Sequence, residues 1–344
     1  MKNLLTLLCI VCACIGFIGC GCGDNISYQV FTRTDPRCSN YQGTYCSTIL
    51  DQTTATPTPL EGKLIIMYSV DTDTCGFVTN GIPNHDVNDG SKKFPNTPAP
   101  VNRLFTITNT PTAAAATTAL GTDRYTAILL NGAVVDLVSD GCCVEGTDGG
   151  TDIQVGCGKA GISIWLLNPM NLAAKFTTDT HNAHCQEDGT YHYHGPPIGL
   201  YAYPSTKVSP VIGFAADGFP IHGPYFEDDK GVIREAISSY KLAGKDRPSS
   251  GCPFGELGKY IDDYCYDGHG DLDRCNGMVV KGQYYYFVTN EYPYMIGCFT
   301  GKPDPSFDRP GTPTPTPSTR PTPTPRKSYD CTSTQWDRRR KNRM

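Results

Sequence analysis

Short runs of apolar and β-branched residues recur along the middle of the chain and predict strands. Three of them have the length of a strand and are rich in Ile, Val, Leu or Tyr, at 63–70, 161–168 and 283–289. Asn131-Gly132 lies between two more apolar runs in 124–138, and Asp217-Gly218 divides 210–226 in the same way. Because Asn-Gly and Asp-Gly favour tight turns, both segments predict β-hairpins.

Helical periodicity is weak throughout the chain. Only 171–176 and 234–242 show a modest helical pattern, and 92–123, which is rich in Thr, Ala, Pro and Asn, predicts a long loop or an insertion. We therefore expect a mainly β, disulfide-stapled single domain over 60–301, with long loops and few short helices.

The first residues predict a secretory signal peptide over 1–22. A single Lys2 precedes an apolar stretch from Leu4 to Ile18, and small residues follow it. The residues before Cys20 also resemble a lipoprotein signal, which would make Cys20 a lipid anchor, so the sequence leaves two forms of secretion open. No segment reaches the length of about 20 apolar residues that a membrane-spanning helix needs.

The distal residues 302–344 predict a tail of a different kind. Alternating Thr and Pro fill much of 309–326, and a shorter echo closes the N-terminal Cys/Thr/Pro segment, 23–59. Such sequences favour extended polyproline geometry and accept O-linked glycans, so we expect a glycoprotein. The tail holds 10 Lys and Arg against 4 Asp and Glu. It would bind an anionic cell-surface polymer or stand in solvent without a partner.

Composition restricts the class of protein further. Charged residues make up 18% and the net charge is only -5, which argues against a nucleic-acid binder. Seventeen cysteines are too many for a cytosolic enzyme, and an even dozen follow residue 22. We expect these to form disulfides, including Cys185, whose alternative is a soft copper ligand. Cys331, in the tail, would pair with the body or with another chain.

Histidines are scarce but concentrated. Five of the seven lie in a stretch of about forty residues, at His181, His184, His192, His194 and His222. In a strand, successive side chains alternate between faces, so two of them, His192 and His194, share one face while Tyr191 and Tyr193 share the other. Two imidazoles on one face, two residues apart, can approach the same ion.

We therefore predict a metal site with His192 and His194 as ligands and with His184 and His222 completing it. Imidazole suits several transition metals, and copper or zinc is the expected ion. The alternative is that these histidines form hydrogen bonds within a polar core. The other two histidines are weaker candidates for the site. His269 lies in a polar sequence that predicts a solvated loop, and no neighbouring residues support a role for His85.

Two stretches resemble the signature sequences of the YHYH domain family. They are GTYHYHGPPIG at 189–199 and IGFAADGFPIHGPY at 212–225, and the resemblance extends over about 125–301. It implies that His192 and His194 belong to the family motif, and it assigns no reaction. At the position of His222 the family more often has tyrosine.

These observations favour a secreted or cell-surface protein that binds a transition metal. Two alternatives stay open: a metal-dependent secreted hydrolase or oxidoreductase, and a cell-surface protein that binds a glycan or matrix. The chain has no recognisable nucleophile elbow, zincin helix or phosphate loop, so the sequence leaves open whether it is an enzyme.

Overall fold

The computed structural model describes residues 31–50, 57–88, 96–139, 141–143, 153–155, 165–171, 178–243 and 257–309. Within these residues the chain is almost entirely strands and loops, with two short 3-10 helices, η2 (Ile261–Asp263) and η3 (Pro305–Phe307). The expectation of a mainly β fold is confirmed. No helix among the described residues is long and apolar enough to cross a membrane.

The first four strands form an antiparallel sheet in chain order. They are β1 (Tyr41–Ile49), β2 (Thr58–Ser69), β3 (Thr74–Thr79) and β4 (Arg103–Thr108). Burial alternates along β2, where Leu64 and Ile66 are buried and Ile65 and Met67 are exposed. This alternation shows that one face of the sheet packs inward and the other faces solvent.

A larger sheet of eight strands contains three of the seven histidines, His184, His192 and His222. In spatial order it consists of β11 (Ala183–Cys185), β12 (Tyr191–Tyr193), β7 (Val134–Val135), β6 (Ala127–Leu129), β13 (Val211–Ala215), β14 (Pro220–His222), β20 (Gln283–Phe287) and β19 (Gly277–Val280). Two neighbouring pairs, β12–β7 and β14–β20, are parallel, and the other pairs are antiparallel.

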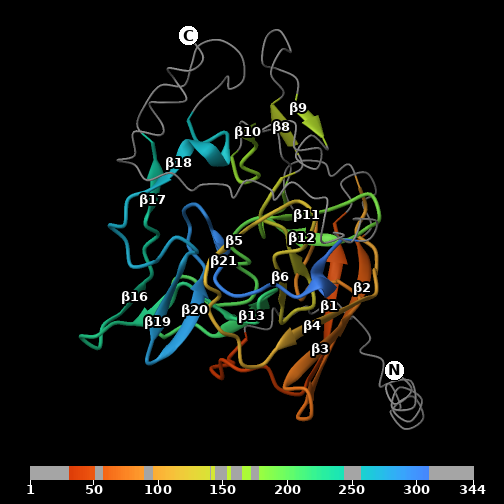
Figure 1. The fold of residues 1–344 in the computed structure, drawn as a ribbon. Coiled ribbons are helices and arrows are strands. Elements are labelled where there is room, and N and C mark those ends of the chain that lie inside the picture. Colours follow the sequence, from red (N-terminus) through yellow and green to blue (C-terminus); the bar gives the residue numbers. More distant parts are fainter. Residues whose placement is uncertain are drawn as a thin grey trace, which may run out of the picture.

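The two sheets pack against each other over one hydrophobic core. Leu64 and Phe77 of the smaller sheet belong to the same buried cluster as Ile128 and Phe214 of the larger one. The rings of Phe77 and Phe214 meet edge to face, with centroids 5.9 Å apart. Figure 1 shows β1–β4, in orange to yellow, standing beside the strands of the larger sheet. The inward face of β1–β4 therefore covers the larger sheet.

Short strands complete the fold as small sheets. Their bounds are β8 (Gly141–Cys143), β9 (Ile153–Val155), β10 (Trp165–Leu166), β15 (Tyr225–Glu227), β16 (Ile233–Glu235), β17 (Tyr240–Leu242), β18 (Tyr264–Tyr266), β5 (Thr118–Ala119) and β21 (Cys298–Phe299). They pair as β10-β8-β9, β15-β16, β17-β18 and β21-β5.

Both predicted hairpins are present. The strands β6 and β7 pair on either side of Asn131-Gly132, and β13 and β14 pair on either side of Asp217-Gly218. Gly132 and Gly218 have φ of 85° and 89°, in the region that glycine enters at little cost. Of the predicted strand at 161–168 and the predicted helix at 171–176, residues 161–164 and 172–176 lie outside the described residues, as do the signal segment and the tail beyond 309.

Two expectations about secondary structure were wrong. The segment 234–242 is not helical, because its residues pair with neighbouring strands in β16 and β17. The segment 92–123 is not one long loop, because it contains β4 and β5. In β4 the buried Phe105 and Ile107 alternate with more exposed neighbours, a six-residue pattern that the surrounding Thr- and Pro-rich sequence hides.

Disulfides connect elements that are distant in sequence. Cys38 is bonded to Cys75 in β3, and Cys275 to Cys298 in β21. The expected disulfide at Cys185 is wrong: this residue is a buried thiol that donates to the carbonyl oxygen of Asn96 at 2.9 Å. Burial raises the pKa of this thiol to about 12, which makes it a poor nucleophile and a poor metal ligand.

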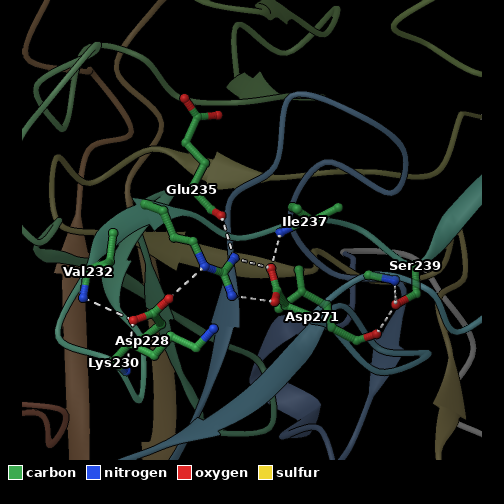
Figure 2. Close-up of polar contacts among 10 residues, drawn as sticks. Asp228, Lys230, Val232, Glu235, Ile237, Ser239 and Asp271 are labelled. Carbon is green, nitrogen blue, oxygen red and sulfur yellow. Dashed lines mark hydrogen bonds and ion pairs between the residues drawn. The ribbon is translucent and has the colours of Figure 1, made fainter.

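An arginine holds the β15–β16 hairpin to the loop before β19. The Arg234 guanidinium donates two hydrogen bonds of 2.7 Å to Asp271. Asp271 and Asp228 are labelled among these polar contacts in Figure 2. Asp228, at the hairpin turn, accepts from the Arg234 Nε at 3.2 Å and from two backbone amides of its own turn. The forked pairing joins two segments that are 37 residues apart in sequence.

This network predicts a pH-dependent contribution to stability. The hydrogen bonds from Arg234 lower the pKa of Asp271 below its ordinary value of 3.8. Its contribution is therefore present above that pH and is lost as the pH falls through the lowered pKa of the folded state. We expect Asp271→Asn to reduce the free energy of unfolding by about 1 kcal/mol at neutral pH. In urea unfolding the difference should disappear in acid, whereas Asp229→Asn, at an exposed neighbour of the turn, should have no effect at either pH.

Candidate metal centre

The pairing of β11 with β12 brings three histidines together on one face of the larger sheet. In this antiparallel pair His184 is directly opposite His192, and Ala183 is opposite Tyr193. Directly opposite residues share a face, and residues two apart on one strand do so as well. His194, immediately after β12, therefore joins the face of His184 and His192, as the sequence predicted.

The three imidazoles converge on one point through the same ring nitrogen. The Nε2 of His194 lies 3.1 Å from the Nε2 of His192 and 3.1 Å from the Nε2 of His184. Each pair of ring centroids is 4.7 Å apart, and the three ring planes are inclined to one another by 75° to 87°. Three nitrogens arranged in this way could hold a metal ion between them.

Hydrogen bonding fixes which nitrogen of His192 carries the proton. Its Nδ1 lies 3.1 Å from the carbonyl oxygen of Thr190, which can only accept, so Nδ1 is the donor. The Nε2 of a neutral His192 therefore presents a lone pair to the centre of the cluster. Such a bond to the remote ring nitrogen also orients histidines that bind metals.

Burial keeps His192 and His194 neutral. His192 and His194 are only 2% and 3% exposed. Burial is the main cause that lowers the pKa of both rings well below 6.5, and the neighbouring histidines lower it further. Arg309 adds a smaller effect in the same direction on both. Neutral imidazole is the form that binds metals.

The tyrosines between the histidines form a separate buried network on the opposite face of the strand. The Tyr191 hydroxyl donates to Asp179 at 2.5 Å. The Tyr193 hydroxyl accepts from the amide of Asn131 at 2.9 Å and donates to the Nε2 of His85. His85 is the donor at Nδ1, to the carbonyl of Asp86, so its Nε2 must accept. The network ties β12 to the β6–β7 turn and to the loop after β3.

The remaining histidines lie elsewhere. The ring of His222 packs beside Tyr285 and Phe287 and belongs to β14, and β7, β6 and β13 lie between β14 and β12. The structure does not bring it to the other three. His181 stacks on His85, with ring centroids 3.7 Å apart. His269 is exposed in a loop, as expected from the sequence.

His85 is a residue of the buried network that no sequence pattern indicates. It is fully buried, and burial lowers the pKa of its ring to about 3, so it is a neutral hydrogen-bond partner. It stands 108 residues before Tyr193, its partner in the network. No local pattern around His85 indicates that contact.

The fold and the site together define a β-rich protein with a buried cluster of three histidines on paired strands. Residues 104–301 match the model of the family described as YHYH protein. This is more than half of the chain, and the chain belongs to that family. No curated protein and no solved structure shows significant similarity to it.

The tyrosine network predicts that Tyr193 stabilises the fold through its hydroxyl. Tyr193→Phe would deprive the buried Asn131 amide and His85 ring of a partner, and we expect a loss of about 1 to 3 kcal/mol in the free energy of unfolding. Urea denaturation measures it. Tyr203→Phe removes a hydroxyl that pairs with Asn290 at the surface and should cost less than about 0.5 kcal/mol. Equal losses in the two variants would contradict the role of the network.

Proposed function

We propose that this protein binds a transition metal, copper or zinc, through the Nε2 atoms of His184, His192 and His194. The fourth predicted ligand, His222, lies on β14, which is separated from β12 by three strands and from β11 by four, so the proposal rests on three ligands. All three ligand atoms lie within 4.8 Å of one another.

The observation that carries the proposal is the shared contact of His194. The Nε2 of His194 faces both the Nε2 of His192 and the Nε2 of His184. The Nε2 of His192 carries a lone pair, because its Nδ1 is the donor. A single hydrogen on His194 can satisfy one of these contacts and leaves the other without a proper hydrogen bond. A metal cation accepts all three lone pairs at once, which accounts for both contacts.

The spacing of the nitrogens supports the choice of metal. Tetrahedral ligands at the usual Zn–N distance are separated by about 3.3 Å from one another. The two observed separations of 3.1 Å are close to this value. Copper also accepts imidazole nitrogen, so the ligand set suits both ions.

A second candidate function is catalysis at the bound metal. Structural zinc sites usually have four protein ligands, whereas catalytic sites keep one position open for water or substrate. The group contains three histidines and no fourth protein ligand among the described residues. This favours metal-assisted hydrolysis or redox chemistry over a purely structural ion.

We also propose that the protein is secreted. The Cys38–Cys75 and Cys275–Cys298 disulfides support an oxidising compartment, and the sequence of 1–22 supports export. Lipidation of Cys20, glycosylation of the tail, its binding to an anionic polymer and pairing of Cys331 stay predictions from the sequence.

Elemental analysis of the purified protein tests the metal site. We expect about one equivalent of copper or zinc in the wild type, and His192→Ala and His194→Ala should each weaken binding by more than about a hundredfold, because loss of a ligand exceeds the loss from its supporting residues. His222→Ala is the matched control, a buried histidine outside the group, and should retain the metal. Unchanged metal content in the His192→Ala/His194→Ala double variant would overturn the proposal.

Thermal unfolding provides an independent test. A metal that binds only the folded state stabilises it by about 2.7 kcal/mol at a hundred times its Kd. We expect Zn²⁺ to raise the Tm of the apoprotein and a chelator to reverse the rise. The His184→Ala variant should show no rise, and an equal rise in this variant would place the metal elsewhere.

A further inference from the structure

Two arginines lie beside the histidine cluster, on the face that carries the ligands. Thr190 lies immediately before β12, two residues before His192, and shares its face. Its hydroxyl accepts a hydrogen bond of 2.9 Å from the Nη2 of Arg103, the first residue of β4. Thr190 is also the residue whose carbonyl oxygen accepts from His192. Arg103 therefore reaches the cluster from the smaller sheet.

The second arginine approaches from the neighbouring strand. In the parallel pair β12–β7, His192 is level with Val134 and Tyr193 with Val135, so Asp136 lies beside His194 on the same face. Asp136 is buried and forms an ion pair with Arg309, the last described residue. The side chain of Arg309 is itself 11% exposed.

One aromatic ring connects the two arginines. The guanidinium carbons of Arg103 and Arg309 are each 5.0 Å from the ring centroid of Tyr125, which is buried just before β6. Two cations thus share one ring at the edge of the histidine cluster. Like charges held this close repel unless anions lie between or beside them.

The charges around the cluster balance only without a metal. Asp136 offsets Arg309, and Asp188, which pairs with Arg103 at 3.1 Å, offsets the other arginine. Histidine binds a metal through neutral imidazole, so the three ligands contribute no negative charge to balance a divalent ion. A bound metal would therefore add two uncompensated positive charges to a buried site, at a high cost in free energy.

Arg103 has donor capacity left over. Asp188 and Thr190 both accept from its Nη2, and its Nε is buried without a hydrogen-bond partner among the described residues. Asp188 is half exposed, so its hold on Arg103 is weakened by solvent. A guanidinium with unused donors is suited to bind a planar or tetrahedral oxyanion.

We propose that the open position of the metal takes a small oxyanion, which Arg103 and Arg309 bind from the side of Tyr125. The inference rests on the proposed metal site and specifies what the site binds besides the metal. The ligand class is a carboxylate, bicarbonate or phosphate oxygen. Such an anion would offset the metal charge and occupy the unused donor of Arg103.

Visible absorption of the Co²⁺-loaded full chain tests this proposal, because the bands of Co²⁺ respond to a change of ligand. Acetate, bicarbonate and phosphate are titrated separately at constant ionic strength set with chloride. We expect a saturable spectral change with at least one of them, with a Kd of about 1 mM or lower. The comparison of the three anions distinguishes a carboxylate from a carbonate or phosphate ligand.

Variants of the arginine and its partner give opposite shifts. Arg103→Gln should weaken oxyanion binding by about tenfold and leave Co²⁺ binding intact. Asp188→Asn removes the competing carboxylate, so oxyanion binding should tighten several-fold, a gain that general damage to the fold would not produce. Lys281→Gln is the charge-matched control, because Lys281 is exposed and pairs with Glu227 at a distant hairpin. It should leave the affinity unchanged.

The outcomes separate this inference from the metal site. A wild type that binds Co²⁺ but shows no spectral response to any oxyanion would overturn the inference and leave the metal site standing. Equal effects of Arg103→Gln and Lys281→Gln would also overturn it. If Arg103→Gln fails to fold, Arg309→Lys takes its place. This variant keeps a positive charge opposite Asp136 and should weaken oxyanion binding. A wild type that binds no Co²⁺ would overturn both proposals.

Discussion

The register between β11 and β12 is the constraint on which the histidine cluster depends. It sets His184 opposite His192, and the alternation along β12 adds His194 to the same face. A slip of one residue would turn the tyrosines to that face and the histidines away from it. The hydroxyls of Tyr191 and Tyr193, anchored to Asp179, Asn131 and His85, oppose such a slip. The tyrosines of the motif thus stabilise the register that brings the three histidines together.

The ligand side of the sheet combines extensive burial with polar and charged groups. Burying such groups is costly unless each finds a partner. Asp136 is matched by Arg309, Asp188 by Arg103, and the Nδ1 of His192 by a backbone carbonyl. This pairing brings the local charge of the metal-free site close to zero, which lets the core form around it. The same neutrality makes the site sensitive to any ion that enters.

Local patterns in the sequence were sufficient for the mainly β class, the two hairpin turns and the face shared by His192 and His194. They did not reveal the strands within 92–123 and 234–242. They failed where a contact depends on the order of strands in the sheet. His222 follows His194 closely in sequence, yet the chain passes to the far side of β7 and β6 before it forms β13 and β14. Conversely, Arg103 and Arg309 lie beside the cluster although they are distant in sequence from the residues they contact there. Arg103 is 87 residues from Thr190, and Arg309 is 173 residues from Asp136. Neither is marked by its neighbours in sequence.

The position of β11 at the end of the larger sheet has a consequence for the lifetime of a bound ion. An edge strand has a ladder of hydrogen bonds on one side only, here to β12, and can separate locally without unfolding the strands behind it. His184 is the one partly exposed member of the cluster and lies on this strand. Exchange of an ion held by these histidines would thereby be coupled to opening of a three-residue strand, at a free energy below that of global unfolding.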